Sequence, residues 1–192
     1  MSYLVAKMLD FTKIRTISIK QRKNKVKLSD LIKPENSKIL VYSKEFNELV
    51  EKIINAHKNN KQIILMMGTH VIKVGMSLLI IDLMKKGIIK HIAMNGAGPI
   101  HDFELALIGE TSEYVEQAIE DGTFGMIEET GRILNEAIKE GARENFGFGY
   151  SIGKKINDLN LQNKEYSILY YAYKLNIPVT VHVAIGTDII HQ

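Results

Sequence analysis

Three short segments of this 192-residue chain combine small residues with side chains that can bind anions or exchange protons. The longest, at positions 95–102, reads Asn-Gly-Ala-Gly-Pro-Ile-His-Asp. Small residues let backbone N–H groups approach a phosphate or a flat cofactor ring, and histidine exchanges a proton near neutral pH. We therefore predict a cofactor-binding turn made of Asn95, Gly96, Ala97 and Gly98. We predict a catalytic pair beside it, with His101 as general base next to Asp102. The alternative is a tight turn that needs glycine for backbone reasons alone.

Two further segments have the same character. Gly68-Thr69-His70 precedes a predicted helix, and a helix N-terminus attracts anions. His70 and Lys73 would share one face of that helix and could both reach a phosphate or a carboxylate. Gly186-Thr187-Asp188 ends the last predicted strand, where the aspartate could bind a ribose hydroxyl or a cationic substrate. Helix capping is the structural alternative for both segments. The predicted cofactor site thus also includes Gly68, Thr69, His70, Lys73, Gly186, Thr187 and Asp188.

Alternating strands and helices are expected to position these segments. Apolar runs predict strands at 39–42, 62–67, 91–94 and 177–183, and helical spacing predicts helices at 45–54, 71–86, 113–119, 128–140 and 164–175. Such alternation implies right-handed βαβ crossovers and a parallel sheet, in which ligands bind at the carboxyl ends of the strands. The continuous apolar run at 62–67 is typical of a central strand covered on both faces. Each polar segment directly follows a strand, so we expect all three to meet.

The predicted fold class is therefore α/β, a three-layer Rossmann-like parallel sheet over residues 38–192, preceded by a basic N-terminal arm at 1–37. Residues 1–60 hold 13 Lys and Arg against 6 Asp and Glu, although the whole chain carries only +3. A nucleic-acid surface is one interpretation, but no aromatic residues interleave with these charges. A solvated arm is the favoured interpretation, and no nucleic-acid partner is predicted. Two segments contain several glycines. The segment 121–125 is expected to be a mobile loop over the site, and 145–153 is expected to be a flexible loop that acts as a lid or a subunit contact.

Several classes of chemistry are excluded at this stage. The chain has no cysteine, which removes thiolate nucleophiles and iron–sulfur clusters. No apolar run approaches the roughly 18 residues that span a bilayer, so no membrane partner and a cytoplasmic location are predicted. The spacings of His101, His182 and His191 relative to Asp102 and Asp188 match no ligand motif, so no metal is predicted.

The order of these motifs resembles the deoxyhypusine synthase-like group. The resemblance rests on Gly68–Lys73, on Asn95–Phe103, and on Ile177-Pro178-Val179 followed by Gly186-Thr187-Asp188. It implies a Rossmann-type domain that binds NAD. The segment 95–98 stands at the family's Thr-Ala-Gly-Gly segment, with His101 at its second acidic position and Asp102 at its aspartate. No residue up to Gln192 corresponds to the family's C-terminal catalytic lysine, so the chain resembles a truncated or divergent relative whose domain is incomplete at its C-terminus.

The resemblance predicts an NAD-dependent transferase or oxidoreductase of unknown substrate, acting on an amine or alcohol carbon. The expected partners are the dinucleotide, a small-molecule substrate and further copies in a homo-oligomer. Two alternatives stay open. One is an isomerase or transferase that binds a sugar phosphate or nucleotide through His70 and Lys73. The other is a non-catalytic assembly module whose basic arm docks on a partner subunit or swaps between subunits.

Overall fold

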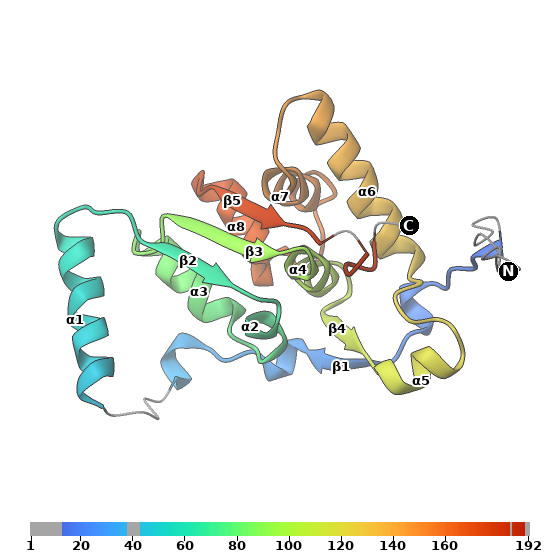
Figure 1. The fold of residues 1–192 in the computed structure, drawn as a ribbon, viewed down its shortest axis with the longest axis horizontal. Coiled ribbons are helices and arrows are strands. Elements are labelled where there is room, and N and C mark those ends of the chain that lie inside the picture. Colours follow the sequence, from blue (N-terminus) through green and yellow to red (C-terminus); the bar gives the residue numbers. More distant parts are fainter. Residues whose placement is uncertain (1–12, 38–42, 185, 191–192) are drawn as a thin grey trace, which may run out of the picture.

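A parallel sheet of three strands lies at the centre of the molecule (Figure 1). The computed structural model describes residues 13–37, 43–184 and 186–190. The strands are β2 (Ile64–Met67), β3 (His91–Asn95) and β5 (Val179–His182), in the order β2-β3-β5. All three run in the same direction, with Met67 opposite Met94 and Asn95 opposite His182. The predicted mixed α/β fold with a parallel sheet is confirmed, and it is consistent with a Rossmann-like arrangement.

Helices make up most of the remaining structure. They are α1 (Lys44–Lys58), α2 (His70–Lys73), α3 (Ser77–Lys85), α4 (Ala97–Ile108), α5 (Val115–Glu120), α6 (Glu128–Arg143), α7 (Phe148–Asp158) and α8 (Ile168–Leu175). Single 3-10 turns occupy 19–21, 28–30, 34–36 and 164–166. Strands β1 (Asn24–Lys27) and β4 (Glu110–Glu113) form a separate antiparallel pair. No helix in the described part of the chain is long and apolar enough to cross a membrane.

The hydrophobic core lies on one face of the parallel sheet. Met67, Ile92 and Met94 point into it and are at most 8% exposed. The other face is open within the described residues, since Ile64 and Met66 are 57% and 80% exposed. The expectation that β2 is covered on both faces is therefore wrong for this part of the chain. A continuous apolar run indicates that both faces of a strand are apolar. It does not predict which elements cover each face.

The described part of the N-terminal arm is built into the body. Strand β1 pairs with β4, and Ile19 is only 2% exposed. The Glu129 carboxylate of α6 accepts two hydrogen bonds from this segment. The Ser18 hydroxyl donates to Oε1 at 2.5 Å, and the Ile19 N–H donates to Oε2 at 2.7 Å. Most basic side chains of this segment are exposed, as the solvated interpretation predicts, but its apolar residues and backbone donors find partners on distant elements.

Two predicted elements also differ. The helix expected at 71–86 breaks between α2 and α3 at Gly75, which has φ +83° and an ideal Cβ position only 2.3 Å from the Asp30 carbonyl oxygen. The flexible loop expected at 145–153 is wrong from residue 148 onward, where α7 begins. Its glycines allow close packing: a Cβ at Gly149 would lie 2.5 Å from the Val179 carbonyl oxygen. The strand predicted at 39–42 lies outside the described residues.

Candidate functional site

The three polar segments lie side by side at the carboxyl edge of the sheet, because β2, β3 and β5 are parallel neighbours. The Thr69 hydroxyl donates to the Ala97 carbonyl oxygen at 3.4 Å. A Cβ on Gly96 would lie 2.1 Å from Oδ2 of Asp188, so these two segments also touch. The predicted meeting of the segments is therefore present in the structure.

A cavity of about 270 Å³ opens beside this edge. Six of the predicted site residues line it, namely Lys73, Asn95, Ala97, His101, Thr187 and Asp188. Six others lie in the same segments without lining it, namely Gly68, Thr69, His70, Gly96, Gly98 and Gly186. The remaining wall comes largely from residues that sequence reasoning did not select, including Arg22, Glu104, Ser112, Glu113 and Phe124.

Helix α4 begins at the strand edge and carries His101 into the cavity. Its N-cap is Gly96, which offers no side chain to its first N–H groups. A Cβ on Gly98 would lie 2.6 Å from the Met94 sulfur, so this glycine lets α4 pack closely on β3. The first turn of a helix of this length attracts anions through its N–H groups, and the Asp188 carboxylate lies beside it. Helix α2, by contrast, is a single turn, and its N-cap Thr69 makes no side-chain cap hydrogen bond. The helix dipole at the predicted anion site there is therefore small.

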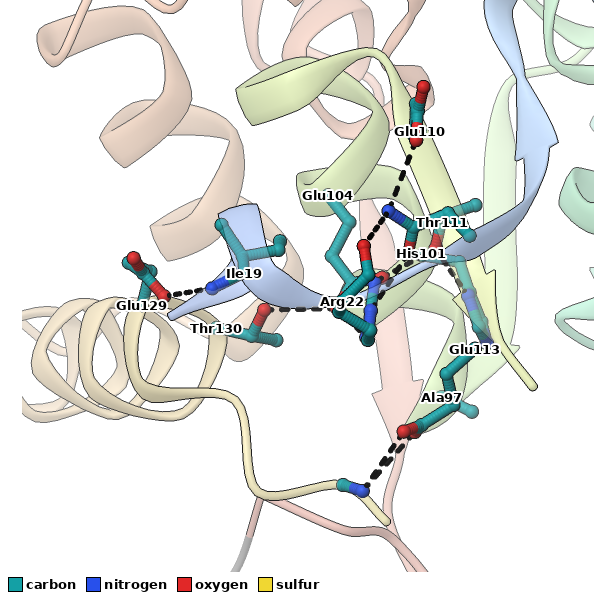
Figure 2. A network of polar contacts seen from close by, with 12 residues as sticks. Ile19, Arg22, Ala97, His101, Glu104, Glu110, Thr111, Glu113, Glu129 and Thr130 are labelled. Carbon is teal, nitrogen blue, oxygen red and sulfur yellow. Dashed lines mark hydrogen bonds and ion pairs between the residues drawn. The ribbon is translucent and has the colours of Figure 1, made fainter. Parts of the chain in front are cut away.

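Behind His101 lies a buried polar network (Figure 2). The Arg22 guanidinium donates to both oxygens of Glu104, at 3.0 and 2.7 Å, and the two side chains are 7% and 1% exposed. The same carboxylate accepts the Thr111 hydroxyl at 2.5 Å and the Thr130 hydroxyl at 3.0 Å. Glu104 thus receives four donors, which satisfy the hydrogen-bonding needs of this buried carboxylate.

This network fixes the protonation of the His101 ring. The Thr111 hydroxyl has one hydrogen, which it donates to Glu104, so its oxygen accepts from Nδ1 of His101 at 2.7 Å. The neutral ring therefore carries its proton on Nδ1 and presents the lone pair of Nε2, which has no hydrogen-bond partner among the described residues. The pKa of His101 is lowered to about 4, mainly by burial; the charge of Glu104 opposes this shift, and Lys73 and Arg22 contribute to it. His101 is thus a neutral acceptor at physiological pH.

Asp102 does not belong to this cavity. It is fully buried and caps α8, accepting the Ser167 hydroxyl at 2.5 Å and the N–H groups of Ile168 and Leu169 at 2.8 and 3.0 Å. The predicted catalytic pair at a rim is therefore wrong, because consecutive residues of a helix point about 100° apart. Burial raises the pKa of Asp102 to about 6.

Ser112, Glu113 and the turn 121–125 contribute to another part of the cavity wall. Ser112 has φ +66°, a left-handed conformation that is unfavourable for residues other than glycine. Burial raises the pKa of its neighbour Glu113, which accepts the Gly125 N–H at 3.2 Å. The turn 121–125, expected as a mobile loop over the site, contributes Phe124 to the cavity wall.

No cluster of three or more histidine or acidic side chains suited to a metal ion occurs within the described ranges. His182 is exposed on the open face of the sheet. His191 lies outside the described residues.

One of the overlooked residues had a signal in the sequence. Glu104 stands among Phe103, Leu105 and Ala106, and a carboxylate inside such an apolar helix needs a strong partner. The partner itself, Arg22, lies 82 positions away and could not be chosen from the other basic residues of the arm.

Comparison with known proteins does not assign this chain to a family. No protein-family model matches the chain, and no curated protein matches it. A solved structure of an LOR/SDH protein from Methanococcus maripaludis S2 is similar over 82% of this chain, with 21% identity and a TM-score of 0.47. The chain spans 46% of the length of that protein.

Proposed function

We propose that this chain is an NAD-binding α/β domain of the deoxyhypusine synthase-like type, which handles a small amine or alcohol at the cavity beside His101. The observation that carries the proposal is the neutral His101 ring, held through Nδ1 by Thr111 in the wall of a cavity at the carboxyl edge of a parallel sheet. Ligands of open α/β sheets bind at that edge.

The residues present suit a dinucleotide. The uncapped first turn of α4, at Gly96 and Ala97, suits a pyrophosphate, and Asp188 on the neighbouring strand end suits ribose hydroxyls. The cavity of about 270 Å³ is close to the lower end of ligand pockets, roughly 300–1,000 Å³. It therefore suits a nicotinamide ring or a small substrate, with the rest of the dinucleotide along the open strand ends.

His101 supplies the proton acceptor in this reaction. The first turn of α4 and Asp188 would hold NAD, which would supply the acceptor for a hydride from the substrate carbon. The N–H or O–H proton of that substrate passes to Nε2 of His101, so an amine becomes an imine and an alcohol a carbonyl compound. Glu104, through Thr111, stabilises the imidazolium that forms, as a carboxylate does in other histidine bases. The low pKa of His101 makes this cation short-lived and favours rapid release of the proton.

A second candidate uses the same edge for a sugar phosphate or nucleotide. Lys73 lines the cavity together with Ala97 of the first turn of α4, and a lysine beside a helix N-terminus is a suitable phosphate ligand. In that case binding, rather than hydride transfer, is the main property of the site.

Thermal unfolding with millimolar NAD, and separately with a sugar phosphate, tests both candidates. A ligand at 100 times its dissociation constant adds about 2.7 kcal/mol, which corresponds to roughly 5–10 °C for a domain of this size. We expect the shift with NAD. A shift with the sugar phosphate alone would reject the first candidate in favour of the second.

The role of His101 is tested by replacing it. His101→Ala should abolish NAD reduction by candidate amines and alcohols while the thermal shift with NAD is retained. His91→Ala, at the other end of β3, is the matched control and should change neither. Equal loss of binding and turnover in His101→Ala would assign the residue a structural role.

A further inference from the structure

Helix α1 carries an apolar stripe that nothing in the described structure covers. The helix buries none of its residues, and Figure 1 shows it standing apart at one end of the molecule. Five large apolar side chains recur on one face at helical spacing and are 37–53% exposed: Phe46, Leu49, Val50, Ile53 and Ile54. The opposite face carries charged residues such as Glu48. An isolated helix with such a stripe gains most of its stability from packing against a partner surface.

The open face of the parallel sheet is a second uncovered apolar surface. Ile64 and Met66 of β2 point to it and are 57% and 80% exposed. Their register partners His91 and Ala93 on β3 lie on the same face. A helix with an apolar stripe is the usual cover for such a sheet face in α/β proteins.

The connection between the two surfaces holds α1 away from its own sheet. The helix ends in a closed turn in which Lys61 N–H donates to the Ala56 carbonyl oxygen at 2.8 Å. Asn60 in that turn has φ +53°, and its side-chain oxygen accepts a hydrogen bond from the Lys90 ammonium. The chain then enters β2 directly, with the Lys90 N–H donating to the Ile63 carbonyl oxygen at 3.0 Å.

We propose that the chain forms a two-fold homodimer in which α1 of each copy packs across the open sheet face of the other. Each chain carries both an apolar helix stripe and an open sheet face. A two-fold contact between two copies therefore covers both surfaces of each copy. Together the exposed apolar side chains present on the order of 700 Å² in each copy, divided between two separate surfaces. Two copies would bury about 1,400 Å² of it, within the range of about 1,200–2,000 Å² for stable interfaces. This inference is independent of the proposed NAD site.

Light scattering after size exclusion is the first test. The wild-type chain should be a dimer at tens of micromolar, and Leu49→Asp and Met66→Asp should each be monomeric. Both side chains are exposed within one chain, so these variants should keep cooperative thermal unfolding. Glu48→Lys, on the opposite face of α1, is the matched control and should remain dimeric. A monomeric wild-type chain, or dimers that persist in both aspartate variants, would reject the contact.

Disulfide cross-linking then tests which surfaces meet, because the chain has no cysteine of its own. A Leu49→Cys chain and an isotopically heavy Met66→Cys chain are mixed and oxidised, and mixed dimers are identified by mass. Glu48→Cys replaces Leu49→Cys in the control mixture. We expect mixed dimers many times faster with Leu49→Cys. Equal rates in the two mixtures would refute the helix-on-sheet contact. A third sample is a single chain that carries both Leu49→Cys and Met66→Cys. If its disulfide forms only within one chain, α1 packs on its own sheet instead.

Discussion

His101 should remain uncharged down to about pH 4, with its proton on Nδ1. Folding lowers the pKa of His101 from its ordinary value of 6.5 to about 4, which corresponds to a penalty of about 3 kcal/mol for the imidazolium. Desolvation by burial is the largest cause, and Lys73 adds to it. At pH 7 only about one molecule in a thousand would carry the charged ring.

This shift has a defined effect on stability. A histidine whose pKa is lowered by folding contributes no penalty above pH 6.5, and the protein loses stability as the pH falls from 6.5 toward 4. Between pH 7 and 4.5 the loss is about 2 kcal/mol by the linkage relation. Asp102 acts in the opposite direction over nearly the same range. Its pKa is raised to about 6, so the folded protein gains stability as the pH falls from 6 toward 3.8.

The two effects offset each other in the wild-type protein, so the His101→Gln variant is the informative comparison. Its free energy of unfolding, measured by urea denaturation, should rise by about 2 kcal/mol relative to wild type when the pH goes from 7 to 4.5. Nitrogen-15 spectra of the imidazole rings report the pKa and tautomer directly. Thr111→Val removes the acceptor for Nδ1 and should mix the tautomers. A His101 pKa near 6.5, a proton on Nε2, or a pH dependence in His101→Gln parallel to that of wild type would refute the reasoning.

Two further substitutions test the other parts of the site. Asp102→Ala leaves three buried donors at the start of α8 without an acceptor and should cost about 3 kcal/mol, seen as a lower melting temperature. The His101 titration should not change, and a changed titration would contradict the separation of the two residues. Gly96→Ala places a Cβ 2.1 Å from Asp188 and should weaken NAD binding at least tenfold by calorimetry. Gly68→Ala is the control, because its Cβ meets nothing within 4 Å; equal effects of the two substitutions would exclude the steric explanation.

The three strands of the parallel sheet and their direction followed from local patterns, whereas the antiparallel pair β1 and β4 was not predicted. The runs at 62–67, 91–94 and 177–183 correspond to β2, β3 and β5, because short apolar runs between turn residues pack into a sheet wherever the chain ends up. Their alternation with helices predicted the parallel order. The convergence of three polar segments then followed from topology, since parallel neighbours end at the same edge.

Glycine-rich segments were harder to interpret from the sequence. The segment 145–153 suggested a flexible loop, yet Gly149 and Gly153 lie in α7, where a Cβ would come within 2.5 and 2.3 Å of carbonyl oxygens of β5 and α8. From the sequence, a glycine that permits close packing cannot be distinguished from a glycine that permits a flexible loop. Only the identity of the facing element distinguishes them.

The sequence by itself determined that this is an α/β chain with polar strand ends at one edge of a parallel sheet, because hydrophobic period and turn residues are local properties. The tertiary structure alone decided the chemistry of that edge. It turned His101 toward Thr111 and a cavity, and Asp102 toward the N-terminus of α8. It also brought Arg22 to Glu104 across 82 positions. Hydrogen-bond partners, burial and therefore pKa values depend on which distant residues meet, and that is a property of the packed chain.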